Sequence, residues 1–332
     1  MATLSSNALT LADWAKRKDP DGKVAAIVEM LSQTNEMLDD MLFVEGNLPT
    51  GHRTTVRTGL PATAWRLLNQ GVQPSKSTTA QIDEACGILE AWCEVDKELA
   101  DLNGNTSAFR LSEAQAFIES MNQEMQQTIL YGNGSTAPEE FTGLSPRYSS
   151  LSAANAQNIV DAGGTGSDNS SIWLVCWGAQ SVHGIFPKGS MAGLEHNNYG
   201  EVTVETTAGI AGTRLRAYQD QWIWRAGIAL RDWRYAVRIA NIDISNLVAK
   251  SSAADLIDLL IKAIHRMPSL NMGRCAFYMN RTCMQMLDIQ KRDDAAAAGM
   301  SYAEADGKIV YSFRGIPIRK VDQLLETESQ IV

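Results

Sequence analysis

The stretch ILYGNGSTAPEEFTGL, Ile129 to Leu144, decides more of the fold than any other part of the sequence. Its first residues end a long amphipathic segment, and Gly132 and Gly134 predict that a helix stops there abruptly. Pro138 and Gly143 predict further turns directly afterwards. No residue of the stretch is an evident acid, base, metal ligand or phosphate cradle. The stretch therefore carries architectural information: a long helix that runs into a tight loop.

The segment before this stretch predicts a helix that begins near Ser112. Ser112 and Gln115 have the spacing of a capping box. Apolar residues recur every three or four positions, which is typical of one buried helical face. These residues are Leu111, Ala114, Ile118, Met121, Met125 and Ile129. Twenty residues of helix would be about 30 Å long.

Residues 46–79, GNLPTGHRTTVRTGLPATAWRLLNQGVQPSKSTT, have a different character. The run from His52 to Thr58 alternates like a strand but offers few side chains of the type that is usually buried. Two such arms would form an extended hairpin without a core of its own, which is unusual in a compact domain. The pattern makes sense if the hairpin lies on a neighbouring subunit. The candidate contact residues are Arg53, Arg57, Trp65, Arg66 and Lys76.

Two alternatives remain open for this hairpin. Trp65 is a favoured type of interface anchor, but it could also pack within its own chain. The arginines form a basic arm on an acidic chain, which suits docking by opposite charge. They could instead line a solvated strand face.

The rest of the chain predicts a mixture of the α+β class. Helices are expected at residues 8–18, 23–42 and 251–268, the last capped by Ser252 or Asp255, with a short one ending near Lys291. Strands are expected at residues 83–95 (where a helical pattern competes, and which a short helix follows), 172–177, 201–206, 221–239 (with a bend near Asp232) and 275–280. A hairpin at 308–321 should turn at Arg314-Gly315, and residues 149–170 predict a loop. The tryptophans expected in the core on strands are Trp173, Trp177, Trp222, Trp224 and Trp233.

Composition excludes several classes of protein. The net charge of −9 disfavours a dedicated nucleic-acid-binding protein, although not a container for DNA. No apolar run approaches the roughly 20 residues that span a membrane, and the N-terminus lacks the apolar core of a signal peptide. The five cysteines have neither the number nor the spacing of a disulfide framework or metal knuckle, so we expect reduced, mostly buried thiols.

The sequence predicts no catalytic, metal or cofactor site. The four histidines, His52, His183, His196 and His265, lack metal-binding spacing. Ser190 lies in KGSMAG, which is not a nucleophile elbow. The loop after Gly132 follows a helix and lacks the lysine of a phosphate-binding loop.

The order of features from about residue 25 to 145 resembles the major capsid proteins of tailed bacteriophages, the Hong Kong 97-type fold. LYGNG…GL is similar to the end of that family's spine helix. AWRLLNQGVQPSKST (64–78) resembles part of its E-loop, and QIDEACGILEAWCEVDKEL (81–99) resembles the strand that returns to its P-domain. CAFYMNRTCMQML (275–287) resembles an A-domain segment, and SFRGIPIRKV (312–321) resembles the family's short Gly-x-Pro hairpin.

This resemblance implies an α+β Hong Kong 97-like fold with an N-terminal arm (1–45), an extended E-loop hairpin (46–80), a P-domain with a long spine helix (81–150), and an A-domain with returning P-domain strands (151–332). The family usually places strands like those at 221–240 at the C-terminus. Here they precede the segment at 275–280, so a permuted strand order is an alternative topology. The Lys–Asn crosslink of the founding member is not implied, because no matched Asn and Glu accompany Lys76.

The function implied is structural and not enzymatic: the chain would form hexamers and pentamers of an icosahedral head around double-stranded DNA, without a cofactor. The implied partners are further copies of the chain, a separate scaffolding protein, a portal protein, a decoration protein as a further candidate, and non-specifically packaged DNA, with no membrane. The N-terminal segment is too short for a built-in scaffold. Assembly is expected in the host bacterial cytoplasm. The alternatives are an encapsulin shell that stores enzyme cargo and a cytosolic α+β enzyme.

Overall fold

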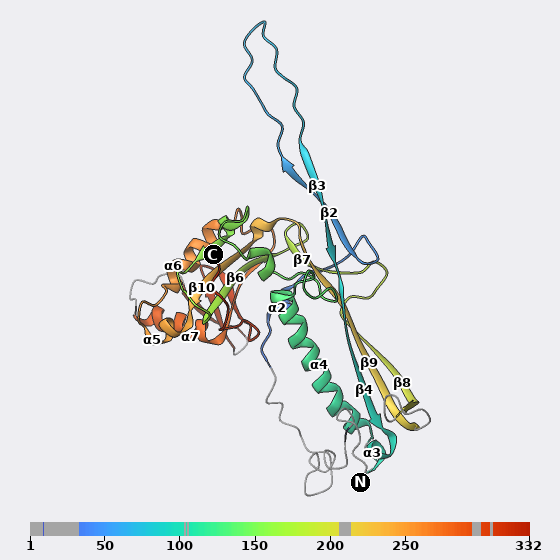
Figure 1. Cartoon of the computed structure of the whole chain (residues 1–332). Coiled ribbons are helices and arrows are strands. Elements are labelled where there is room, and N and C mark those ends of the chain that lie inside the picture. The colour runs from blue at the N-terminus through green and yellow to red at the C-terminus, as the bar shows by residue number, and fades with distance from the viewer. Residues whose placement is uncertain are drawn as a thin grey trace.

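The computed structural model describes residue 9 and residues 33–102, 104, 106–205, 214–293, 300–305 and 308–332. Figure 1 shows three parts: a globular body, a long sheet with helix α4 beside it, and a thin hairpin that projects away from both. In the part of the chain that the structure describes, no helix is long and apolar enough to cross a membrane.

Close backbone contact holds the end of helix α4 (Thr106–Tyr131). The Gly143 amide donates to the Gly132 carbonyl at 2.8 Å, and the Leu144 amide donates to the Ile129 carbonyl at 2.9 Å. A Cβ on Gly143 would lie 2.5 Å from the Thr128 carbonyl oxygen, so only glycine permits this approach. The predicted helix stop is confirmed, and its physical reason is the loop folding back onto the helix end.

The predicted start of this helix was wrong, because α4 begins at Thr106. The Ser112 hydroxyl donates to the Phe109 carbonyl within the helix, so it does not cap the N-terminus. The predicted apolar stripe is buried only in its later part, while Leu111 and Ile118 are exposed. Phe109 takes the buried place in the first turns instead.

The long sheet consists of three antiparallel strands, β4 (Gly87–Asp96), β9 (Arg214–Leu230) and β8 (Leu194–Glu205), with β9 in the middle. A small core that includes Phe109, Met121 and Trp222 packs α4 against one face of this sheet. The short helix α3 (Lys97–Asp101) follows β4, as predicted.

The single strand predicted at 83–95 is in fact two strands that pair with different partners. β3 (Thr78–Ala85) pairs with β2 (Gly51–Gly59) in the projecting hairpin, whereas β4 pairs with β9. Between them the Cys86 amide donates to the Thr50 carbonyl at 3.0 Å. The chain therefore leaves the hairpin and enters the long sheet within one residue.

The globular body is built around β6 (Asn169–Trp177), whose residues are all buried. Two strands pair antiparallel with it, β10 (Ala236–Asp243) and β11 (Arg274–Met279). The sheet continues through β14 (Ile316–Lys320), β13 (Lys308–Phe313) and β12 (Met300–Ala305) on one side and β5 (Ile159–Asp161) on the other. The connection to the long sheet runs through β7 (Val182–Phe186), which pairs with β9 and with β1 (Phe43–Glu45).

Three helices belong to this body: α5 (Ile244–Ala249), α6 (Leu256–Arg266) and α7 (Arg281–Asp293). Helix α6 starts at Leu256 because the Asp255 carboxylate accepts from the Asp258 amide at 3.1 Å. The Asp255 cap is thus confirmed. Ser252 lies outside the helix in a left-handed conformation, so it was the wrong choice of cap.

The bend predicted near Asp232 is a complete break. β9 ends at Leu230, a 3-10 turn covers Trp233–Tyr235, and β10 begins at Ala236. The Asp232 carboxylate accepts from the Arg234 amide at 3.1 Å and so stabilises the turn. Trp233 therefore lies in this turn, whereas the sequence had predicted it on a strand.

Two further predictions need correction at the N-terminal side and in the loop before β6. The helix predicted at 8–18 lies outside the described residues, apart from residue 9. Of the helix predicted at 23–42, the described part contains only α2 (Met37–Asp40), because the Thr34 amide donates to Asp322 and Asn35 bridges to Val321. The predicted loop 149–170 contains β5, which pairs with β10.

Candidate functional site

The projecting hairpin is the most exposed part of the described chain. Beyond the paired strands, residues 60–77 form neither helix nor strand, and we call them the hairpin tip. The tip turns between Leu67 and Gln70, whose amide donates to the Leu67 carbonyl at 3.2 Å. The Ser75 hydroxyl donates across the tip to the Ala62 carbonyl at 2.8 Å. The tip therefore has a defined path but no packing partner among the described residues.

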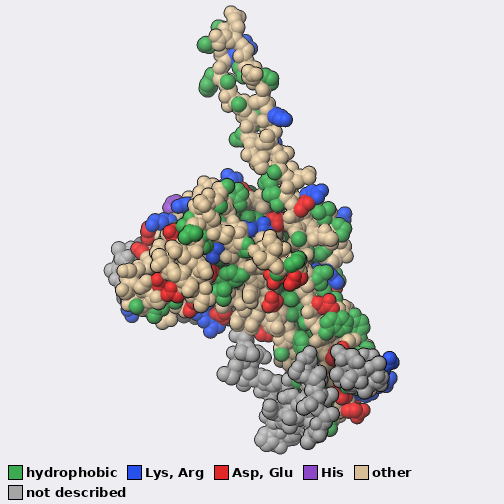
Figure 2. Space-filling view, in the orientation of Figure 1, with side chains coloured by type: hydrophobic (Ala, Val, Ile, Leu, Met, Phe, Trp, Pro, Cys, Tyr) green, Lys and Arg blue, Asp and Glu red, His purple; other side chains and the backbone are tan. Residues whose placement is uncertain are grey.

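Several hydrophobic side chains and a few basic ones are exposed along the projecting hairpin (Figure 2). Trp65 is fully exposed, at 104% of its reference area, and Leu68 is 89% exposed. Leu60 and Leu67 are also exposed. The tip contains the basic residues Arg66 and Lys76 and no acidic residue. A monomer gains nothing from exposing such a group of side chains in water.

The structure places the five predicted contact residues in two different settings. Arg53 lies near the hairpin base, where its guanidinium is 2.5 Å from the Asp83 carboxylate. Their hydrogen bond raises the pKa of Arg53 and lowers the pKa of Asp83. Arg57, Arg66 and Lys76 are exposed and have no ion-pair partner among the described residues, and Trp65 stands free at the tip.

The root of the hairpin, in contrast, is buried against the body. His52 on β2 meets His183 on β7 edge to face, with ring centroids 5.9 Å apart. Burial lowers the pKa of both imidazoles, that of His183 to about 4, with nearby Arg231 acting in the same direction. Across the strand pair from His52, Glu84 accepts two hydrogen bonds of 2.6 Å from Arg147. The hairpin is therefore anchored at one end and free at the other.

The long sheet has an open face on the side opposite α4. Trp92 on β4 and Tyr199 on β8 stack there at 5.7 Å between ring centroids, and both are about half exposed. Glu90 accepts hydrogen bonds from the Trp92 and Gln221 side chains, and Glu94 accepts from Gln219 at 2.8 Å. We call this surface the outer face. It combines exposed aromatic area with fixed carboxylates.

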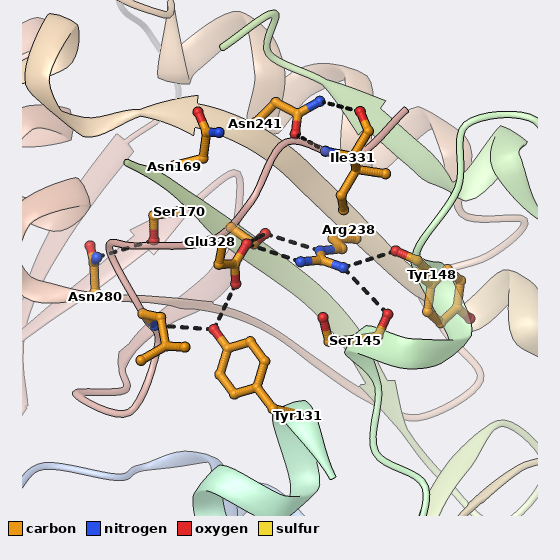
Figure 3. Close-up of polar contacts among 12 residues, drawn as sticks. Tyr131, Ser145, Tyr148, Asn169, Ser170, Arg238, Asn241, Asn280, Glu328 and Ile331 are labelled. Atoms are coloured by element: carbon orange, nitrogen blue, oxygen red, sulfur yellow. Dashed lines mark hydrogen bonds and ion pairs between the residues drawn. The ribbon is translucent and has the colours of Figure 1, made fainter. Parts of the chain in front are cut away.

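A buried polar cluster ties the C-terminal segment to the body and to the end of α4 (Figure 3). Arg238 on β10 and Glu328 form an ion pair at 2.9 Å, with both side chains almost fully buried. Glu328 also accepts from the Tyr131 hydroxyl at 2.6 Å and from the Ser171 hydroxyl. Arg238 donates to the Tyr148 carbonyl at 2.9 Å. Burial and the Glu328 carboxylate raise the pKa of Tyr131.

This cluster has partners for its charges but no reacting centre. Removing one member of such a buried pair leaves an uncompensated charge, so its role is to fix the relative position of three chain segments. No group of three or more His, Cys, Asp or Glu side chains in the described residues could hold a metal ion. A groove of about 430 Å³ between α4 and β8 contains Asp220, which is already paired with Arg110 at 2.7 Å.

Comparison with known proteins identifies the family to which this chain belongs. Residues 19–332 match the family described as Major capsid protein GP7. The chain belongs to that family. A solved structure of bacteriophage Epsilon15 is 32% identical, with a TM-score of 0.80, and the match covers 100% of this chain and 99% of that one. The Hong Kong 97-type α+β fold expected from the sequence is thereby confirmed.

More distant structures resemble parts of this GP7-family protein. The bacteriophage JBD30 capsid is 7% identical with a TM-score of 0.47, over 89% of this chain and 92% of that one. The SrpI encapsulin of Synechococcus elongatus is 11% identical with a TM-score of 0.45, over 71% of this chain and 97% of that one. No curated protein sequence matches the chain.

As a GP7-family major capsid protein, the chain is a structural component of a phage particle and not an enzyme, and it assembles with copies of itself. Sequence reasoning missed three features of this protein: the His52–His183 contact, the outer face, and the buried Arg238–Glu328 pair. The apolar residues at every second position from Leu89 to Val95, with Glu90 and Glu94 between them, could have revealed the outer face. The lone arginine within the apolar run of β10 could have signalled a buried partner, but not which one, because Glu328 lies 90 positions away.

Proposed function

We propose that the chain builds the hexamers and pentamers of an icosahedral head, and that the hairpin tip of each copy docks on the outer face of a neighbour's long sheet. The observation that carries this proposal is the tip itself, where Trp65 and three leucines are exposed and no described residue outside the tip covers them. The tip is fixed at a buried root and held away from the body (Figure 1). Such an arm can reach a second molecule while its base stays rigid.

The energetics favour burial of the tip in an assembly. Burying one large apolar side chain stabilises a complex by about 1.5–3 kcal/mol relative to leaving it exposed. Tryptophan is a frequent anchor at interface centres, where a few residues carry most of the binding energy. Trp65 can therefore act as the anchor, with Leu67 and Leu68 beside it.

Charge and chemistry favour the outer face as the receptor. It offers the exposed aromatic pair Trp92 and Tyr199 next to Glu90 and Glu94, whereas the tip offers Trp65 next to Arg66. Opposite charges across an interface steer the encounter and fix its register. The carboxylates are already held by hydrogen bonds within the sheet, so docking costs little ordering of the receptor.

The remaining partners follow from the family resemblance. A scaffolding protein would guide assembly, a portal protein would occupy one vertex, and a decoration protein is a further candidate on the outside. The packaged double-stranded DNA would be enclosed without a tight grip, in keeping with the net charge of −9. Assembly is proposed to occur in the cytoplasm of the host bacterium.

Removing the hairpin tip tests the docking arm. Gly59 and Thr78 are paired partners, so residues 60–77 can be replaced by an Asn-Gly turn without moving the strands. We expect a subunit with an unchanged circular dichroism spectrum and unfolding midpoint that forms no shells in sedimentation and electron microscopy. The paired substitution Gln70→Ala and Gln73→Ala in the same tip should still form shells. Shells of normal yield from the deletion variant would overturn the proposal.

A charge exchange tests the receptor. Arg57→Glu combined with Arg66→Glu should abolish or slow assembly, and Glu90→Lys combined with Glu94→Lys should do the same. Mixing the two variants places opposite charges across each mixed contact, so shell formation should partly return. Normal assembly of either variant alone at both low and high salt would exclude this face as the receptor, and so would a mixture of two blocked variants that forms no shells.

A further inference from the structure

A pair of cysteines faces each other in the middle of the globular body. Cys176 on β6 and Cys275 on β11 are direct register partners in an antiparallel strand pair. Direct partners point to the same face of a sheet, and their Cα atoms lie about 4.5 or 5.5 Å apart. Both spacings fall within the range of about 4.4–6.8 Å that a disulfide spans.

The backbone on both sides of this pair is held tightly in place. A Cβ on Gly273 would lie 2.1 Å from the Trp177 carbonyl oxygen, and one on Gly178 would lie 2.8 Å from the Met272 carbonyl oxygen. The turn before β11 is thus pressed against the end of β6. The register that places the two sulfurs together is therefore fixed by backbone packing and does not depend on the thiols themselves.

The two sulfurs differ in access to solvent. Cys176 is completely buried, whereas Cys275 is partly exposed and its thiol donates to the Leu270 carbonyl at 3.3 Å. A reagent in solution can reach Cys275, and Cys176 is placed to attack from behind.

We propose that Cys176 and Cys275 form a reversible disulfide that joins β6 to β11 when the protein meets a low-molecular-weight disulfide such as oxidised glutathione. The Cys275 sulfur attacks the glutathione disulfide, forms a mixed disulfide, and releases one glutathione thiol that carries the Cys275 proton. The Cys176 sulfur then attacks the Cys275 sulfur and releases the second glutathione thiol with the Cys176 proton. Two protein thiols are oxidised and one glutathione disulfide is reduced to two thiols.

The geometry also predicts that this bond is easily reduced. Cβ atoms of direct partners are about 4.5–5.5 Å apart, which is at or beyond the roughly 3.5–4.5 Å that relaxed disulfides prefer. A strained disulfide is more readily reduced than a relaxed one. Inside a reducing cell the pair stays as thiols, and outside the cell it closes. This inference does not depend on the proposed docking of the hairpin.

The test uses the full-length protein. We would incubate it with oxidised glutathione, block free thiols with N-ethylmaleimide, digest without reduction, and identify the linked peptides by mass spectrometry. The expected result is one linked pair containing Cys176 and Cys275, lighter by two hydrogen atoms than the sum of its peptides. Free thiols should fall from the five in the sequence to three, and dithiothreitol should restore five.

Matched variants complete the test. Cys275→Ser should keep all its remaining thiols free, whereas Cys93→Ser, whose register partner on β9 is Asp220, should still form the linked pair. Glutathione that stays attached to Cys275, linkage of other cysteines, or five free thiols in the oxidised wild type would each overturn the proposal. The wild-type peptide map decides the question even if Cys275→Ser folds poorly.

Discussion

Two hairpins in this molecule share a local pattern but have opposite surroundings. In β13–β14, Arg314 and Gly315 both have positive φ, and the flanking Phe313, Ile316 and Ile318 are buried in the body. In β2–β3, the strands run on into a tip whose large apolar side chains are all exposed. The difference teaches that strand pattern alone does not tell whether a hairpin supports its own chain or another one. The β13–β14 hairpin should govern the stability of the subunit, and the β2–β3 hairpin should govern its assembly.

The largest expected contrast comes from truncating one aromatic residue in each hairpin. Phe313 is 2% exposed and packs edge to face on Phe277, so Phe313→Ala should lower the free energy of unfolding by about 3–5 kcal/mol. Trp65→Ala should change it by less than about 0.5 kcal/mol, because no packing is lost within the chain. Denaturant unfolding of the unassembled subunit measures both values.

Phe313→Leu serves as the matched control, since this hydrophobic change should cost less than about 1.5 kcal/mol. For assembly the order should reverse: Trp65→Ala should reduce the shell yield strongly although its subunit is as stable as the wild type. A large loss of subunit stability in Trp65→Ala would show that the tip packs within its own chain, and the comparison would fail.

The buried pair behind β10 should give the next largest effect. Glu328→Gln keeps the shape of the side chain but removes the charge that faces Arg238. Charge-assisted hydrogen bonds contribute about 1.5–3 kcal/mol, and we expect a loss of that size in denaturant unfolding. Glu326→Gln is the control in the same segment, because the Glu326 carboxylate accepts a 3.2 Å hydrogen bond from Asn280 and forms no ion pair within the described residues. Equal losses in the two variants would contradict a special role for the pair.

The buried root of the projecting hairpin predicts a smaller, pH-dependent effect. Because the pKa of His183 is lowered to about 4 by burial, Arg231 and His52, the folded state binds fewer protons than the unfolded chain. Above about pH 6.5 the imidazoles are neutral, and the folded state keeps its full stability. Stability should fall as the pH drops from there towards 4, by about 1–2 kcal/mol at pH 5.

This pH effect is measured by comparing unfolding at pH 7 and pH 5. His183→Gln should lose less stability between these values than the wild type. His265→Gln, at an exposed position on α6, should keep the wild-type difference. The charged neighbours Arg231 and Glu84 face the pair and should be left unchanged in these variants. If His183→Gln showed the same pH dependence of stability as the wild type, the His52–His183 pair would not titrate as the structure implies.

The smallest effect is expected at the base of the same hairpin. The Arg53 and Asp83 side chains pair on the surface with about half of their area exposed, so Arg53→Ala should leave the unfolding midpoint of the subunit within experimental error. It should also affect assembly less than Arg57→Glu with Arg66→Glu, because Arg53 is already engaged. A block of assembly by Arg53→Ala alone would move the docking contact from the tip to the hairpin base.

Predictions from the sequence succeeded where a local signal has one structural solution. The stop of α4 after Tyr131, the Arg314-Gly315 turn, and the Asp255 cap were all found in this way, because turn and cap residues act within a few positions. The start of α4 was missed, since Ser112 offers a cap-like pattern that the chain satisfies within the helix. The domain boundaries and the role of the five hairpin residues stay predictions.

The sequence by itself determined the class of fold, the long helix with its loop, and a hairpin too poor in apolar cover to be part of a core. These properties depend on periodicity, turns and composition, all of which are local. The tertiary structure alone decided that Arg238 meets Glu328, that His52 meets His183, and that Cys176 faces Cys275. The members of each pair lie at least 90 positions apart in the sequence, and how whole strands pack decides whether they meet.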